Sequence, residues 1–165
     1  MMDFILLGIG RWLHIAAGVM WIGLLYYFNF VQVPAMADAG KDGTAAGISK
    51  HVAPRALFWF RWAAVVTWLA GALLLGANFH KAFLFLDRPF YAIGIGAWLG
   101  TIMIFNVWVL IWPNQQKILG MVPATDPEKA KARRIAFLAS RTNTMLSIPM
   151  LFFMAAAGHQ GIFFR

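Results

Sequence analysis

Long apolar runs alternate with short polar stretches along the chain. The clearest run extends from His14 to Val33, which is twenty residues without Lys, Arg, Asp or Glu. An α-helix needs about 20 such residues to cross the hydrocarbon core of a bilayer. Three further runs follow the same pattern. The sequence therefore predicts an all-α integral membrane protein built as a bundle of four transmembrane helices.

Prolines suggest where these helices begin and end. Proline fits the first turn of a helix, disrupts its interior, and biases the residue before it away from the helical conformation. We therefore expect Pro34 and Pro113 to end the first and third helices, and Pro54 to begin the second. The predicted helices cover residues 4–33, 55–78, 89–112 and 130–158 of a single membrane domain, 1–165. The polar loops cover residues 34–54, with a short interfacial helix over 44–52, and 113–130.

Basic residues predict the orientation. The two polar loops and the helix ends beside them carry ten Lys and Arg residues, whereas the opposite side carries four. Basic residues concentrate on the cytoplasmic side of membrane proteins. We therefore expect both loops in the cytoplasm and both termini in the periplasm, as in an N-out/C-out multi-pass protein of the bacterial inner membrane.

Composition excludes several classes of protein. The chain is 61% hydrophobic and 12% charged, which is more apolar than a soluble domain of this size could bury. The absence of cysteine excludes disulfides, thiolate metal sites and a covalent c-type heme. The net charge of +8 is explained by basic loops facing anionic lipid, so we expect the lipid bilayer and no nucleic acid as a partner.

Depth counting places three histidines near the outer boundary: His14, His80 and His159. Imidazole ligates heme iron as well as copper and zinc, and a b-type heme needs no cysteine. We therefore predict that His14, with His159 or His80, binds heme b, or a metal ion if no heme is bound. Gly18 lies one turn from His14 and would leave room for a flat porphyrin. The alternative stays open that these histidines only meet water and lipid headgroups.

The opposite boundary receives arginine and amide side chains from every helix. The candidates are Asn29, Arg61, Asn106, Arg141 and Asn143. Guanidinium groups bind carboxylates through a planar fork of donors, so this layer predicts a site for an anionic or polar ligand. Two structural alternatives remain. The arginines are then interface anchors, and Asn106 makes a hydrogen bond between helices.

Four long strings, one per helix, carry a family resemblance: HIAAGVMWIGLLYYFNFVQ, PRALFWFRWAAVVT, GTIMIFNVWVLIWPNQQK and SRTNTMLSIPMLFFMAAAGH. Together they resemble the membrane domain at the N-terminus of bacterial membrane-bound urate oxidases (urate hydroxylases), in a short four-helix form. The architecture is loosely similar to the four-helix membrane protoporphyrinogen oxidases and copper-resistance membrane proteins. The resemblance implies a multi-helix bundle tied to redox chemistry, with electrons passed to a cytochrome c.

Three functional hypotheses follow. The leading one is a membrane redox protein of the urate-oxidase membrane-domain type that binds heme b and passes electrons to a cytochrome. The second is a cofactor-free accessory subunit of a larger respiratory or photosynthetic complex, docked through a face containing Gly96 and Gly100. The third is a component of a urate hydroxylase. Homo-oligomers and larger membrane complexes are both compatible with the sequence.

Overall fold

A computed structural model of the chain describes residues 2–158, with side chains from residue 7 onward. Within that range the chain is helical, with short turns and no strand. The elements are α1 (Met2–Tyr26), η1 (Tyr27–Gln32), α2 (Val33–Asp42), α3 (Ala45–Gly47), η2 (Ile48–Val52), α4 (Ala53–Leu75), η3 (Gly76–Asn78), α5 (Phe79–Phe83), η4 (Arg88–Phe90), α6 (Tyr91–Phe105), η5 (Asn106–Ile111), α7 (Trp112–Ile118) and α8 (Asp126–Ala157). The predicted all-α fold is confirmed.

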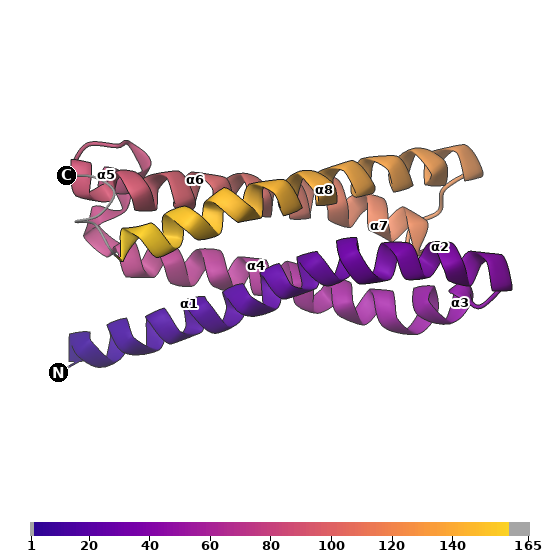
Figure 1. Cartoon of the computed structure of the whole chain (residues 1–165), viewed down its shortest axis with the longest axis horizontal. Coiled ribbons are helices and arrows are strands. Elements are labelled where there is room, and N and C mark those ends of the chain that lie inside the picture. Colours follow the sequence, from indigo (N-terminus) through magenta and orange to yellow (C-terminus); the bar gives the residue numbers. More distant parts are fainter. Residues whose placement is uncertain (1, 159–165) are drawn as a thin grey trace.

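These elements form four long helical rods that lie side by side and alternate in direction (Figure 1). The first rod joins α1, η1 and α2, the second α3, η2 and α4, and the third α6, η5 and α7, while α8 forms the fourth alone. The first three are long and apolar enough to cross a membrane. α1 packs mainly along α4, and α6 along α8, and contacts of α4 with α6 and of α1 with α8 join the two pairs.

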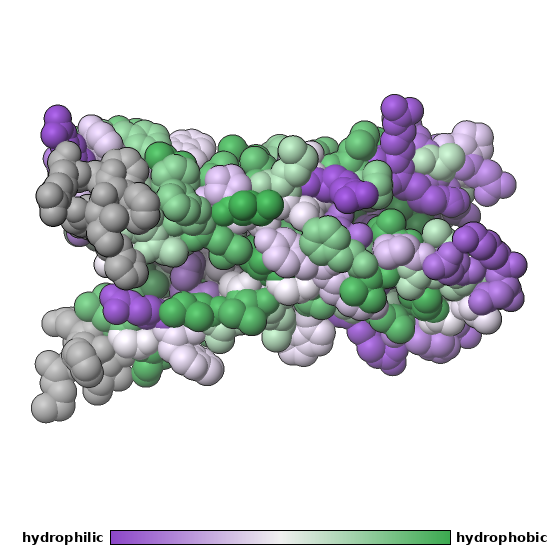
Figure 2. All heavy atoms as spheres, in the orientation of Figure 1, coloured by the Kyte–Doolittle hydropathy of each residue, from purple (hydrophilic) through white to green (hydrophobic). Residues whose placement is uncertain are grey.

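The two ends of the bundle differ in polarity. The beginning of α1, α5 and the end of α8 lie at one end, and α2, α3, α7 and the beginning of α8 lie at the other (Figure 1). Hydrophilic residues gather over the second end, whereas hydrophobic residues cover much of the middle (Figure 2). Large apolar side chains such as Val19 on α1 and Met145 on α8 are about 70% exposed. Such an extended apolar surface is typical of a protein that contacts lipid or a partner.

The fourth rod, α8, has the opposite distribution of polarity from a helix of a soluble protein, with polar residues facing inward and apolar residues facing outward. Its polar residues Asn143, Thr144 and Ser147 are buried, while Met145 and Ile148 are exposed. Polar groups on the inner face of a bundle can bond to neighbouring helices. These polar residues also lower the mean hydropathy of the helix. For this reason α8 is not among the three rods whose length and hydropathy suit a membrane span.

The prediction that Pro34 and Pro113 end their helices was wrong. Each proline lies two residues beyond a π-helical segment, η1 or η5, and the helix continues to Asp42 or Ile118. In η1 the wide turn is closed by the N–H of Val33, which donates to the carbonyl of Phe28 five residues earlier. A proline ring collides with the carbonyl four residues before it in a regular α-helix. A π turn changes that spacing, so the proline can be accommodated.

The predicted loops are consequently too long. Residues 33–42 and 45–52 are helical, so the first turn is confined to Gly43 and Thr44. Gly43 has a φ of 80°, a left-handed conformation that favours glycine. The predicted short helix over 44–52 is confirmed as a helix. The second loop shrinks to residues 119–125, because the third rod extends to Ile118 and α8 begins at Asp126, four residues earlier than expected.

The core of the bundle is apolar, and glycine allows α6 to approach its neighbours closely. The most buried apolar residues are Trp21, Ile22, Leu25, Phe28, Leu57, Phe60, Ala63, Ala64, Met103, Val107, Ile111, Ala139 and Met150. Gly96 and Gly100 are buried, and a Cβ on Gly96 would lie 3.3 Å from the side chain of Met154 on α8. The face containing Gly96 and Gly100 is therefore used inside the bundle and does not present a docking surface.

Candidate functional site

A stripe of four small polar residues runs along the inner face of α8. Ser140, Asn143, Thr144 and Ser147 follow the i, i+3, i+4, i+7 spacing that places side chains on one side of a helix. This stripe faces α1 and η1 on one side and α6 and η5 on the other, as its hydrogen bonds show. It is the main polar feature of the bundle interior within residues 7–158.

Two asparagines join the third and fourth rods at the centre of this stripe. The side-chain amide of Asn106 donates to Oδ1 of Asn143 at 2.8 Å. The amide of Asn143 donates in turn to the backbone carbonyl of Met103 at 2.9 Å. Asn143 is fully buried and Asn106 is 9% exposed. The structure therefore contains the interhelical hydrogen bond that the sequence offered as the structural role of Asn106.

The first rod is tied to the same stripe. The amide of Asn29 donates to the carbonyl of Leu25 and to Oγ of Ser140, both at 2.8 Å. The hydroxyl of Tyr26 and that of Ser147 lie 2.9 Å apart. Hydrogen bonds to α8 from two neighbouring rods fix the rotation of α8 about its own axis, because each requires a particular side chain to face inward.

Four buried polar atoms of the described residues have no hydrogen-bond partner. The side-chain oxygens of Asn29 and Gln32, both on η1, are buried and accept no hydrogen bond from the described residues. The indole nitrogens of Trp21 and Trp108 are buried donors without such a partner. A buried polar atom left unpaired costs about 1–3 kcal/mol. The interior therefore offers two acceptors and two donors to water or to a small polar ligand.

The arginines of the predicted anion site lie apart from these amides. The guanidinium carbon of Arg61 lies 3.7 Å from the ring centroid of Trp112, in a cation–π contact. Arg141 is exposed and lies 5.2 Å from the ring of Phe137. No hydrogen bond in the described part of the chain links either arginine to Asn106 or Asn143. The predicted set is therefore divided into three buried amides, Asn29, Asn106 and Asn143, and two arginines that contact aromatic rings.

His14 occupies the contact between α1 and α4. Its Nδ1 lies 2.8 Å from the backbone carbonyl of Thr67, so Nδ1 carries the proton and donates it. A Cβ on Gly71 would lie 2.9 Å from Cε1 of the ring, so only glycine leaves room for the imidazole there. In the neutral ring Nε2 is then the nitrogen with a free lone pair, and no described residue donates to it. Gly18 does not face open space, since a Cβ there would lie 3.7 Å from Cγ2 of Thr67.

The other predicted histidine ligands are less constrained. His80 is exposed on α5, at the end of the bundle where α1 begins (Figure 1). His159 lies outside the described residues. Among residues 7–158 no group of three His, Asp or Glu side chains is arranged to hold a metal ion. The predicted three-histidine layer therefore has one positioned member, His14.

Several residues of the polar interior were absent from the sequence prediction. Ser140, Ser147 and Tyr26 take part in the hydrogen bonds described above. The signal that points to the serines is the i, i+3, i+4, i+7 spacing around Asn143. Tyr26 gives no such signal, because its partner lies 121 positions away in the chain.

A family model described as urate oxidase N-terminal matches residues 77–165, which is more than half of the chain. The matched region includes α6, η5, α7 and α8, and with them the buried asparagine pair. His14, Asn29 and Arg61 precede it. No curated protein matches the chain, and no solved structure does.

Proposed function

Because the chain belongs to the urate oxidase N-terminal family, we propose that it is the membrane component of a urate-oxidase-type redox system, with His14 as a ligand of heme b. The observation that carries the heme proposal is the contact between Nδ1 of His14 and the carbonyl of Thr67. A histidine that ligates a metal commonly donates its other ring N–H to a carbonyl or carboxylate, which fixes its tautomer and orientation.

The surroundings of His14 fit a ligand role. Nε2 is the atom that would bind iron, through its lone pair. A Cβ added to Gly71 would lie 4.0 Å from Nε2 and 3.1 Å from Nδ1, so Nε2 is the ring nitrogen farther from Gly71. The hydrogen bond from Nδ1 to the carbonyl of Thr67 holds the ring against α4. This one bond is enough to orient Nε2. When bound, a heme supplies one-electron transfer. His80 or His159 remains the proposed second axial ligand.

An optical spectrum of the purified protein, expressed with adequate heme and recorded before and after dithionite, tests this proposal. We expect a Soret band and a reduced α-band that are lost in His14→Ala. His51→Ala is the matched control, because His51 is exposed and lies on η2 at the other end of the bundle. Absence of both bands from the wild type, or their survival in His14→Ala, would overturn the heme assignment.

Electron transfer to a cytochrome c, with urate as donor, is the finer form of the proposal. Membranes containing the protein are then expected to reduce added cytochrome c when urate is supplied. Arg141→Ala tests whether the exposed guanidinium recruits the anionic substrate, since Arg141 is not needed for the buried hydrogen bonds. If the wild type shows no urate-dependent reduction of a suitable acceptor, the urate part of the proposal fails. The heme part is then tested only by the optical spectrum.

Membrane placement is proposed as N-out/C-out in the inner membrane. The chain contains no cysteine, so single cysteines can report the side on which each turn lies. Thr44→Cys marks the turn after α2, and Leu86→Cys the exposed turn after α5. An impermeant maleimide added to intact spheroplasts should label the second and spare the first. The reverse pattern would invert the topology.

A cofactor-free accessory subunit is the outcome if no chromophore is bound and stoichiometric partners co-purify. Gly96 and Gly100 would play no part in such docking, because both are buried inside the bundle. The exposed apolar residues of α1 and α8 would have to form the contact instead.

A further inference from the structure

We infer that the outer face of the α1–α4 pair binds one phospholipid with an anionic headgroup. Two surface hollows lie on this face, and both are lined by Trp59. The first, of about 580 Å³, is lined by Lys50, Pro54, Arg55, Phe58 and Trp59. The second, of about 350 Å³, is lined by Val19, Met20, Gly23, Leu24 and Trp59.

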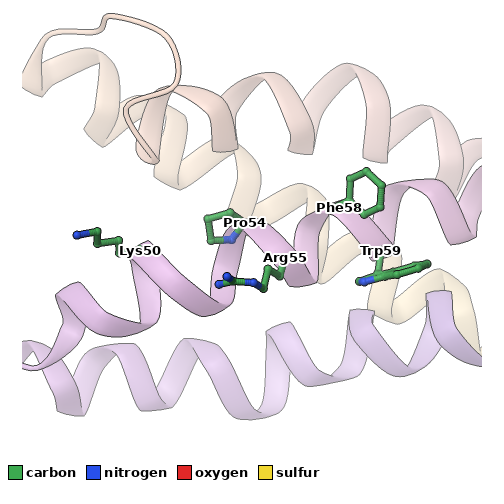
Figure 3. A pocket seen from close by; sticks show the side chains of 5 residues that line it. All are labelled: Lys50, Pro54, Arg55, Phe58 and Trp59. Atoms are coloured by element: carbon green, nitrogen blue, oxygen red, sulfur yellow. The ribbon is translucent and has the colours of Figure 1, made fainter.

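The first hollow has the chemistry of a headgroup site. Its five side chains follow η2 and the first turns of α4, with the cations Lys50 and Arg55 toward one end and Trp59 at the other (Figure 3). Neither cation forms an ion pair within the described part of the chain, where the pairs are Lys41 with Asp38 and Lys81 with Asp87. Unpaired lysine and arginine at a membrane surface attract the phosphate of anionic lipids.

Arg55 is also positioned by the backbone. Its Nη1 donates to the carbonyl of His51, which lies in the π-helical segment directly before α4. This contact uses one of the five guanidinium N–H groups and directs the side chain back toward η2. The remaining donors face the hollow or solvent, since Arg55 is exposed.

The second hollow has the chemistry of an acyl-chain site. Its lining is apolar, and Gly23 leaves a depression on α1 because nothing lies within 4 Å of a Cβ added there. Lys50 and Trp59 are nine residues apart on a continuous helix, which spans ~13 Å. A lipid with its phosphate at Lys50 and Arg55 would therefore reach the apolar hollow with its acyl chain, beside the interfacial ring of Trp59.

Native mass spectrometry of the detergent-solubilised protein tests this inference. The probes are phosphatidylglycerol and phosphatidylcholine with identical acyl chains. We expect the wild type to retain phosphatidylglycerol about fivefold more than phosphatidylcholine, and Lys50→Gln with Arg55→Gln to abolish that preference. Arg133→Gln with Arg134→Gln is the matched control, because it removes the same charge from exposed residues at the same end of the bundle.

A second pair of variants tests the acyl-chain hollow. Gly23→Leu places a side chain in the hollow, and its first added atom, Cβ, meets nothing within 4 Å; retention of both lipids should fall by roughly threefold or more. Gly8→Leu is its control, since Gly8 is also exposed on α1 with nothing within 4 Å of a Cβ, but lies outside the hollow. Helical content by circular dichroism shows that all variants fold.

Equal retention of the two lipids by the wild type would overturn the inference, as would equal losses in the two double variants. A dimer that Gly23→Leu disrupts would overturn it too, because a second copy would then occupy the face. The inference rests on the membrane placement proposed above and not on heme. Maleimide labelling that shows no spanning topology defeats both proposals, whereas a lipid-retention failure in a correctly inserted protein defeats only this one.

Discussion

The two helix pairs of the bundle are joined in different ways. Between the third rod and α8 the contact contains Asn106 of η5 and Asn143, which are hydrogen-bonded to each other, and Asn143 also donates to the backbone of α6 deep in the core. Between α1 and α4, among residues 7–158, the hydrogen bond in the contact runs from the side chain of His14 to the backbone of Thr67, with Gly71 against the ring. In the first arrangement Asn106 donates to Asn143, which donates in turn to the backbone, and in the second one imidazole nitrogen is left available.

The two contacts therefore have different roles: the asparagine contact specifies how two helices pack, whereas the histidine contact leaves an atom that can bind a ligand. A buried amide pair fixes the register of two helices, because any rotation or shift breaks both hydrogen bonds. A histidine held through one nitrogen is oriented while its other nitrogen can still bind a ligand. The family match covers the α6–α8 pair and not the α1–α4 contact. The matched half therefore contains the buried amide contact, and His14, the first proposed heme ligand, lies in the other half.

The largest expected effect is that of Asn143→Leu. The substitution removes both hydrogen bonds and leaves the side-chain amide of Asn106 without its partner in the core, while the carbonyl of Met103 still accepts from the backbone N–H of Asn106. We expect the free energy of unfolding, measured by denaturant titration in micelles, to fall by about 2 kcal/mol. Asn114→Leu is the control, because Asn114 bonds only to a carbonyl of its own rod. A loss below about 0.5 kcal/mol would show that the amide pair does not specify the contact.

The double variant Asn106→Leu with Asn143→Leu sharpens this test. Replacing both partners by apolar groups leaves fewer unsatisfied atoms than replacing one. The double variant should therefore be more stable than the sum of the two single losses predicts. Simple additivity would mean that the two amides act independently despite their 2.8 Å contact.

Gly71→Ala should have an intermediate effect, on the α1–α4 contact alone. The added Cβ would lie 2.9 Å from Cε1 of His14, so the ring must move and its bond to Thr67 is lost. We expect a loss of about 1 kcal/mol relative to Gly100→Ala, whose Cβ meets nothing within 4 Å. If His14 ligates heme, the Soret band of Gly71→Ala should also shift or weaken. An unchanged spectrum with reduced stability would make His14 a packing residue.

The smallest effect concerns pH and the beginning of α8. Glu128 accepts hydrogen bonds from the backbone N–H and hydroxyl of Thr125, and these, with nearby Lys117, hold the pKa of Glu128 below its ordinary value. A lowered folded-state pKa stabilises the fold at neutral pH, and this contribution disappears as pH falls through the folded pKa. The stability difference between wild type and Glu128→Gln should therefore be constant above the ordinary glutamate pKa of 4.5 and shrink as pH falls below it. A difference that persists in acid would exclude the ionised carboxylate as its source.

The sequence predicted the number of long helices and the placement of the turns at opposite ends. Apolar run length determines both, and the correct resemblance to the urate oxidase family rested on the strings within those runs. The sequence prediction was wrong at Pro34 and Pro113. The rule that proline ends a helix is based on regular α-helices and does not anticipate a π turn directly before the proline. The sequence prediction selected Asn106 and Asn143 by depth, but it did not pair them. Pairing depends on which faces of two distant helices meet, and no local pattern contains that information.

Segments η1, η2 and η5 introduce shifts in helical phase. A π turn contains about one residue more than an α turn, and each residue of an α-helix rotates the next side chain by about 100°. Everything beyond such a segment is turned by roughly that angle relative to an uninterrupted helix. A helical wheel drawn through residues 7–42 would therefore assign α2 the wrong face. Deleting one residue from Tyr27–Gln32 would change no chemistry near Pro34, yet it would reorient α2 and the turn at Gly43. The length of each π segment is thus a structural variable in its own right, comparable to the register of a strand.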